Sequence, residues 1–335
     1  MTVLPDTLKR LKVSSRLVVN RALARGWVVE PYESNPSIMK LTLPSRAQPI
    51  HIFSAAPPHA SYVASKIAQD KFITNKILAD RGVPVPAELL LHAGHDLPQD
   101  AIDAFLAEHK RIIVKPLDAS HGKGITTDIT AKAALRKAIS VAQKQAKTGR
   151  VLLQNHLEGL DLRVLCVGYK FISAIHRTPA RVIGDGRHTV AELIDVTNED
   201  RGENYSKRLN KIPSNEAEGY LGKKRYNSVP AKQEIVQVLG VANVGKGGEL
   251  QNVTTEVPQF LIELSEAIAR TLFLPVCGID FLIAKLPTKD VTKQQLHPVV
   301  IEVNETPMLM MYEDTESALQ DRVIDAYLDF IETSE

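Results

Sequence analysis

The chain has 335 residues, of which 44% are hydrophobic and 24% are charged, a composition typical of a folded protein with two or three substructures. Its 41 basic and 39 acidic residues leave a formal net charge of +2. This balance excludes the strong positive field by which many proteins bind nucleic acid or an anionic membrane surface. We therefore expect small-molecule partners, with any anion held by a local cluster of cations.

The cysteines and the N-terminal sequence indicate a cytoplasmic protein. Cys166 and Cys277 lie inside apolar runs, so we expect both to be buried as small hydrophobic side chains rather than joined in a disulfide. The first residues lack an apolar stretch of signal-peptide length. No run approaches the roughly 20 apolar residues of a membrane span.

Helical and strand-like patterns alternate along the chain. In its first part they predict a helix over 14–25 that ends at Gly26, strands over 27–32, 37–44 and 49–56, and one or two helices over 61–82. They then predict strands over 111–117 and 151–157, a helix over 131–146, a hairpin over 161–177 that turns at 168–170, and a polar segment over 185–230. The last part is predicted to hold a helix over 259–272, strands over 278–283 and 299–307, and a final helix over 319–331. Strands interleaved with helices and hairpins indicate an α+β fold in layers rather than an all-parallel sheet.

Two strand-like runs near the C-terminus carry carboxylates among apolar residues. Asp280 lies in the first run, and Glu302 and Asn304 lie in the second. Because side chains alternate along a strand, Glu302 and Asn304 point to one face. Carboxylate and amide oxygens are hard ligands that suit Mg²⁺ better than a thiophilic metal. The alternative is that the two carboxylates lie at strand edges and pair with lysines.

A glycine-containing loop follows the strand that carries Lys115. Glycines allow backbone N–H groups to approach a phosphate closely, and a strand lysine can reach the same anion. The order of lysine and loop is not that of a Walker A motif, which disfavours a P-loop nucleotidase. Taken singly, the loop also suits a plain hairpin turn, and Lys71 suits an ordinary helix surface.

Five stretches in a fixed order together resemble the motif set of the ATP-grasp superfamily: QDKFITNKIL, IIVKPLDASHGKGIT, LLQNHLEGLDLRVLCVG, GIDFLI and VIEVNETP. The likeness extends over nearly the whole chain to the ATP-grasp module of cyanophycin synthetases and of bifunctional glutamate-cysteine ligase/glutathione synthetases. It implies an α+β ATP-grasp fold with an N-terminal domain over 1–65, a central domain over 66–157 and a C-terminal domain over 158–335. ATP would then be held between the last two.

The resemblance also implies a nucleotide site. Lys71 and Lys115 match the lysines on the phosphates, and Ser120, His121, Gly122 and Gly124 match a mobile loop that covers them. Gln154, Asn155, His156 and Leu157 match the segment beside the adenine, and Asp161 matches the acidic residue on the ribose.

The substrate and metal roles follow from the same resemblance. Arg177 matches the arginine near the reacting acyl phosphate, and Arg163 is expected to support the site. Asn243, Gly247 and Gly248 match the stretch on the substrate side, and Asp280, Glu302 and Asn304 match the ligands of Mg²⁺. Two ions are expected, with Mn²⁺ as an alternative metal.

Three positions differ from the pattern of many relatives. Gln154 replaces a glutamate, Met308 replaces a glycine after Pro307, and Val241 occupies a position that is often basic. A glutamine oxygen accepts a hydrogen bond from the adenine amine as a carboxylate does. The other two positions belong to the acceptor side of the site.

The resemblance implies an ATP-dependent carboxylate–amine ligase that acts on amino acids or short peptides through an acyl phosphate and releases ADP and phosphate. A closed, dry site would align the reactants and protect that intermediate. A kinase that uses the same nucleotide site and a nucleotide-binding regulatory pseudoenzyme are the alternatives. A homodimer is left open.

Overall fold

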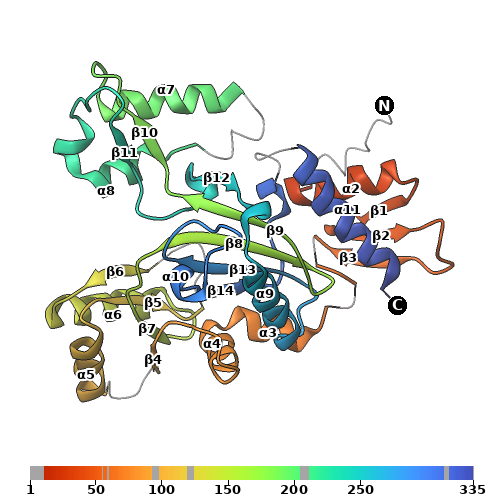
Figure 1. Cartoon of the computed structure of the whole chain (residues 1–335), viewed down its shortest axis with the longest axis horizontal. Coiled ribbons are helices and arrows are strands. Elements are labelled where there is room, and N and C mark those ends of the chain that lie inside the picture. The colour runs from red at the N-terminus through yellow and green to blue at the C-terminus, as the bar shows by residue number, and fades with distance from the viewer. Residues whose placement is uncertain are drawn as a thin grey trace.

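The computed structural model describes residues 11–54, 56–58, 60–92, 98–118, 124–203, 211–312 and 317–334. Within those ranges the chain forms sheets of three, four and five strands and a separate two-stranded ribbon (Figure 1). Three of the four sequence-predicted loop residues, Ser120, His121 and Gly122, lie outside the described residues. None of the described helices is long and apolar enough to cross a membrane.

The N-terminal unit is a three-stranded antiparallel sheet covered by two helices from opposite ends of the chain (Figure 1). Its elements are α2 (Val13–Ala24), β1 (Val28–Tyr32), β2 (Asn35–Thr42), β3 (Ile50–Phe53) and the last helix, α11 (Ser317–Thr333). Arg21 of α2 and Arg25, which directly follows that helix, both pair with Asp325 of α11, at 2.5 Å each. The last helix is therefore part of the unit with which the chain begins.

Two short helices follow, α3 (Tyr62–Gln69) and α4 (Lys71–Ala79), and the break between them is encoded locally. Asp70 has an extended backbone, and its carboxylate accepts hydrogen bonds from the N–H groups of Phe72 and Ile73, which caps α4. Because the break falls here, Lys71 is the first residue of α4, and that helix packs on the edge strand of the largest sheet.

The central unit is a four-stranded antiparallel sheet with the strand order β4-β7-β5-β6. Its elements are β4 (Glu88–Leu91), α5 (Gln99–His109), β5 (Ile112–Pro116), β6 (Thr126–Ile129), α6 (Lys132–Gln145) and β7 (Val151–Asn155). The apolar faces of α5 and α6 form one buried cluster with the strands, which accounts for the periodic spacing of their hydrophobic residues.

The largest sheet is antiparallel, with the order β12-β9-β8-β13-β14. Its strands are β8 (Leu160–Val167), β9 (Lys170–Thr178), β12 (Glu249–Asn252), β13 (Val276–Ile283) and β14 (Val299–Asn304). Leu162, Val164 and Cys166 belong to the face that packs on helix α9 (Gln259–Thr271). Cys277 is paired in register with Cys166, and both thiols are buried and free.

The opposite face of this sheet changes character along its length. At one end Leu165, Ile175 and Val276 pack against the N-terminal unit in a single apolar cluster. Two residues further along the strands, the same face carries charged side chains in place of apolar ones, among them Arg163 and Arg177. Alternation along the strands puts all of these side chains on one face. The N-terminal unit therefore covers only part of it.

A small insertion with its own hydrophobic cluster projects from the sheet between β9 and β12 (Figure 1). It contains β10 (Arg181–Ile183), α7 (Val190–Glu203), α8 (Ser214–Tyr226) and β11 (Ile235–Gln237). The remaining short elements are η2 (Val244–Lys246), η3 (Thr254–Glu256), α10 (Lys293–Leu296) and η4 (Leu309–Tyr312).

Most sequence-predicted helices and strands occupy their predicted positions, including the hairpin β8–β9. The patterns did not reveal β4, α5, β6 or the three short strands β10 to β12. The proposed boundary between 65 and 66 falls inside α3, and α11 packs on both α2 and the largest sheet. The division into three domains remains a proposal.

Candidate active site

Asp280 is the most buried charged residue of the site and is held by two arginines. It is 3% exposed, and Arg163, its register partner on β8, donates to both carboxylate oxygens, with Nη2 2.8 Å from Oδ2. Arg177 Nη2 lies 3.1 Å from the same Oδ2. Burial opposes the charge of Asp280, but the two guanidinium groups outweigh it and hold the pKa of this carboxyl below its ordinary value.

Asp161 and Arg177 form a second bidentate pair on the same face. They are register partners on β8 and β9, and Arg177 Nε and Nη2 lie 2.7 and 2.9 Å from the two oxygens of Asp161. Burial, helped by the negative charge of Asp280, raises the pKa of Asp161 against the opposing charge of Arg177. The residues that the sequence assigned to the ribose and to the reacting group therefore form one ionic unit with Asp280.

Glu302 faces Asp280 across β13 and β14 but is paired with a different cation. Its Oε1 lies 2.6 Å from Nζ of Lys71, a contact that spans 231 residues of the chain. The start of α4 is thereby brought to the predicted metal ligands.

Lys115 enters the same cluster from β5 of the central unit. The side chain is 8% exposed. Burial, and secondarily the positive charge of Lys71, lower the pKa of Lys115 to about 8 against the opposing charges of Glu88 and Glu302. Two lysines from separate elements thus converge near Glu302.

Glu88 of β4 belongs to this cluster and was not anticipated. Its Oε1 accepts a hydrogen bond from Asn75 Nδ2 at 2.6 Å and another from Nε2 of Gln154, its register partner on β7. Burial raises the pKa of Glu88, although both hydrogen bonds and Lys115 oppose the shift. In sequence Glu88 is a lone acid before three leucines, so no pattern could have singled it out.

The remaining residues of the predicted adenine segment are held mainly through the backbone. Asn155 Oδ1 accepts from Ala87 N at 2.9 Å, and His156 N donates to Arg111 O at 2.8 Å. His156 Nδ1 is buried without a hydrogen-bond partner. Leu157 follows in the connection to β8. The segment therefore begins in β7, which ends at Asn155, and continues into the connection to β8.

Gly124 is the one residue of the predicted phosphate loop that the structure describes. Its φ is +72°, a conformation that favours glycine. A Cβ atom at this position would lie 2.9 Å from Pro116 Cγ and 2.9 Å from Gln145 Cβ. A side chain at this end of the loop would therefore both strain the backbone and press against the central unit.

The predicted substrate residues form a tight turn beside the strand of Arg177. Asn243 caps the turn by accepting from Gly245 N at 2.9 Å, and Gly248 N donates to Asn243 O at 3.0 Å. Gly247 has a φ of +85°. A Cβ on Gly248 would lie 3.0 Å from Thr178 O, so glycine is needed where the turn meets β9.

The predicted metal ligands are oxygen donors of the kind that Mg²⁺ prefers, but the two carboxylates, Asp280 and Glu302, are already in ion pairs. Lys71, Lys115, Arg163 and Arg177 stand against Glu88, Asp161, Asp280 and Glu302, four cations and four carboxylates. Asn304 Nδ2 is buried with no partner. The described residues contain no cluster of three His, Cys, Asp or Glu side chains that would hold a metal by themselves. The donor set fits Mg²⁺ that shares its shell with phosphate oxygens.

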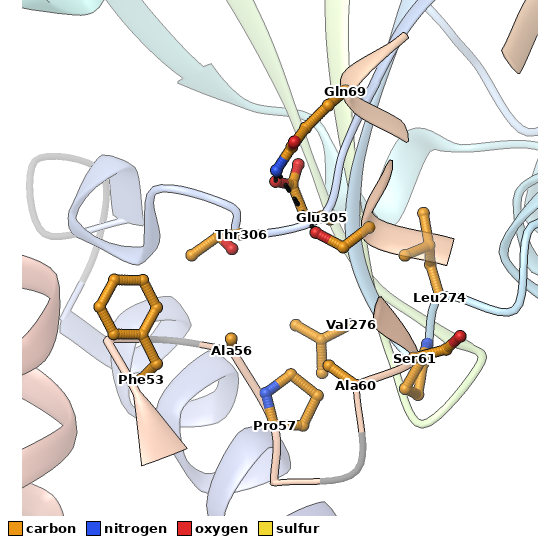
Figure 2. A pocket seen from close by; sticks show the side chains of 12 residues that line it. Phe53, Ala56, Pro57, Ala60, Ser61, Gln69, Leu274, Val276, Glu305 and Thr306 are labelled. Atoms are coloured by element: carbon orange, nitrogen blue, oxygen red, sulfur yellow. Dashed lines mark hydrogen bonds between the residues drawn. The ribbon is translucent and has the colours of Figure 1, made fainter. Parts of the chain in front are cut away.

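A cavity of about 160 Å³, lined in part by Glu305 and Thr306, lies at the junction with the N-terminal unit (Figure 2). Its walls come from the end of β3, from α3, from the start of β13 and from the residues after β14; Phe53, Ser65, Gln69, Val276, Glu305 and Thr306 are among them. Glu305 accepts a hydrogen bond from Gln69 Nε2 at 3.0 Å (Figure 2). With roughly 30 Å³ per water molecule, the cavity suits a small chemical group.

The sequence and the fold of the chain are similar to those of known proteins. The family model described as prokaryotic glutathione synthetase, ATP-grasp domain, matches residues 96–198. A bifunctional glutathione synthetase from Pasteurella multocida has a similar structure, with a TM-score of 0.67 and 24% sequence identity over 96% of this chain and 44% of that chain. The chain therefore carries an ATP-grasp domain and adopts the α+β ATP-grasp fold, which confirms the fold predicted from its motifs.

Curated relatives agree with this result. Cyanophycin synthetase from Crocosphaera subtropica is 34% identical over 280 residues, which are 82% of this chain and 31% of the relative. The glutathione biosynthesis bifunctional protein GshAB from Mannheimia succiniciproducens is 29% identical over 311 residues, 90% of this chain and 40% of the relative. The sequence resemblance to these two groups is confirmed. The chain spans about a third of the length of the curated relatives that it matches.

Proposed function

We propose that the chain is an ATP-dependent carboxylate–amine ligase. The observation that carries this proposal is the convergence of Lys71, Lys115 and Glu302 from three separate elements at one end of the charged sheet face. Clustered cations beside a hard-oxygen donor set are what the triphosphate of a nucleotide needs, because negative charge must be met by preorganised positive groups during phosphoryl transfer.

In the proposed reaction a substrate carboxylate oxygen attacks the γ-phosphorus of ATP, ADP leaves, and an acyl phosphate forms. The nitrogen of an amine then attacks the carbonyl carbon, phosphate leaves, and the nitrogen loses a proton to give an amide. We assign Arg177 to the charge on the reacting carboxyl group, because a guanidinium can hold two oxygens at once.

Binding of the nucleotide would redistribute the pairs within the cluster. Lys71 would leave Glu302 for the phosphates, and Glu302 would become free to bind metal together with Asp280 and Asn304. Magnesium would neutralise the phosphate oxygens, which is the chemistry that a bound divalent ion supplies to phosphoryl transfer. We propose two ions, with Mn²⁺ as an alternative metal.

We place the substrates on either side of the reacting centre. The turn that holds Asn243, Gly247 and Gly248 lies beside the strand of Arg177 and would line one side. The cavity lined by Glu305 and Thr306 would take part of the other substrate (Figure 2). An amino acid or short peptide is the substrate class that we propose, in the cytoplasm, where two facing free thiols persist.

The test is an assay of purified protein with Mg·ATP against panels of amino acids and dipeptides. A ligase releases ADP and phosphate only when both a carboxylate and an amine are present, and hydroxylamine in place of the amine traps the acyl phosphate as a hydroxamate. A stable phosphorylated product without amide would establish a kinase instead. ATP binding without turnover under all conditions would identify a regulatory pseudoenzyme, and release of pyrophosphate would contradict the assignment of attack at the γ-phosphorus.

A further inference from the structure

We propose that Glu88 sets the nucleotide preference of the site by fixing the orientation of the Gln154 side-chain amide. This inference rests on the proposed function, which places the adenine beside Gln154. Glu88 itself is a positioning residue that acts through Gln154, and none of the sequence motifs includes it.

The geometry leaves the Gln154 amide one orientation. Gln154 is 5% exposed, and its Nε2 donates to Oε1 of Glu88, which is directly opposite on the neighbouring strand. An ionised carboxylate only accepts hydrogen bonds, so it selects the amide nitrogen of Gln154 and turns the amide oxygen away. Asn75 Nδ2, at 2.6 Å, donates to the same carboxylate oxygen and helps to hold it in place.

The oxygen that is turned away can distinguish purine bases. Adenine carries an amino group at position 6, which donates a hydrogen bond, whereas hypoxanthine and guanine carry a carbonyl oxygen there, which only accepts. A fixed amide oxygen of Gln154 therefore accepts a hydrogen bond from the amino group of ATP. In ITP the same oxygen would meet the carbonyl oxygen of the base, and two acceptors repel each other. A Gln154 amide that was free to rotate would suit both bases.

The pair also explains why glutamine suits this chain where many relatives have glutamate. A glutamate at 154 would set two carboxylates against each other in a buried position, which disfavours the ionisation of both. The cation near Glu88 is Lys115, which already interacts with the charges of Lys71 and Glu302. With a glutamate at 154, Lys115 would have to balance a further negative charge. The glutamine provides the acceptor without the second charge.

The test measures the affinities of the whole chain for Mg·ATP and Mg·ITP by calorimetry at pH 8. The wild-type protein is expected to prefer ATP. In Glu88→Gln the residue at 88 can turn its own amide, so Gln154 loses its fixed orientation, and the ATP preference is expected to fall about tenfold, the value of one hydrogen bond. The reciprocal double variant Glu88→Gln with Gln154→Glu restores one donor facing one carboxylate, and the preference for ATP is expected to return.

A matched control is Glu234→Gln, which removes a glutamate that accepts two hydrogen bonds in the insertion, far along the chain from Gln154. Its ATP preference should equal that of the wild type. If Glu88→Gln does not fold, Glu88→Asp replaces it, because the shortened carboxylate retreats from Gln154. A wild-type protein that binds ATP and ITP equally, or a Glu88 variant with unchanged preference, overturns this inference alone. Failure of the wild-type protein to bind either nucleotide overturns the proposed function as well.

Discussion

Asp280 and Glu302 face each other across one strand pair, yet Asp280 is held by Arg163 and Glu302 by Lys71. The two carboxylates therefore differ in how readily they can change partners. Asp280 is almost fully buried between two guanidinium groups, whereas Glu302 is paired with a single lysine at a helix start. If Glu302 is a metal ligand as proposed, it is the one that nucleotide binding would release from its ion pair.

We expect Mg²⁺ to bind tightly only when ATP is present. Mg²⁺ dehydrates reluctantly and usually shares its shell between carboxylates and substrate phosphates, and Lys71 competes for Glu302 until phosphate attracts it. Calorimetry should show weak Mg²⁺ binding to the free protein and strong binding with ATP. Glu302→Ala should abolish turnover. Tight binding of Mg²⁺ without nucleotide, or an active Glu302→Ala variant, would refute the assignment.

Affinity for ATP should fall as the pH rises above about 8, because burial and Lys71 place the pKa of Lys115 there. The phosphates of ATP stabilise the charged form of Lys115, so ATP binds best below that pH. Above it, Lys115 must take up a proton when ATP binds. The expected slope is about tenfold per pH unit until the pKa of the bound state is reached. Calorimetry in buffers of different ionisation enthalpy measures both effects. Lys115→Arg should be insensitive to pH over this range, since arginine stays protonated.

Arg177→Lys is expected to reduce turnover far more than ATP affinity. A lysine at this position keeps a positive charge near Asp280 but cannot hold two oxygens of Asp161 or of a reacting carboxyl group. The measurement is kcat beside the dissociation constant of ATP. Equal losses in both would show that Arg177 serves the nucleotide or the fold instead.

Removal of the Arg177 side chain should also lower stability. Arg177→Ala leaves Asp161 and part of Asp280 unpaired in a buried position, which costs about 3–5 kcal/mol. Arg181→Ala breaks an exposed pair with Glu249 and should cost about 1 kcal/mol or less. Urea unfolding of the two variants measures the contrast, and similar losses would mean that the Asp161–Arg177 unit is not structurally important.

The sequence predicted those parts of the site that lie on one strand. Alternation alone placed Glu302 and Asn304 on a common face, and their pairing with β13 adds Asp280. The contact of Lys71 with Glu302 spans 231 residues, so no local pattern could reveal it, although the family motif did point to both residues.

The pairing of strands determines which side chains of the site contact one another, and the sequence patterns could not predict these contacts. Asp161 and Arg177 were expected to serve different parts of the reaction, but the register of β8 and β9 joins them in one ion pair. Glu88 was missed because its role depends only on its position opposite Gln154. Helix α11 was predicted as a helix, but its packing against α2 depends on tertiary contacts that a hydrophobic period does not encode.

Bulk in the cavity lined by Glu305 and Thr306 should weaken the binding of a ligase substrate without affecting ATP. Ser65 lines this cavity from α3, one helical turn before Gln69. Ser65→Leu would fill part of a space of about 160 Å³ that suits a small group. Ser65→Ala is the matched control, because it removes the hydroxyl without adding bulk.

We expect Ser65→Leu to raise the KM of one substrate about tenfold or more, which corresponds to the loss of roughly 1.4 kcal/mol of binding. The dissociation constant of ATP should stay at the wild-type value in both variants. Unchanged KM values for the carboxylate and the amine in Ser65→Leu would show that neither substrate enters the cavity.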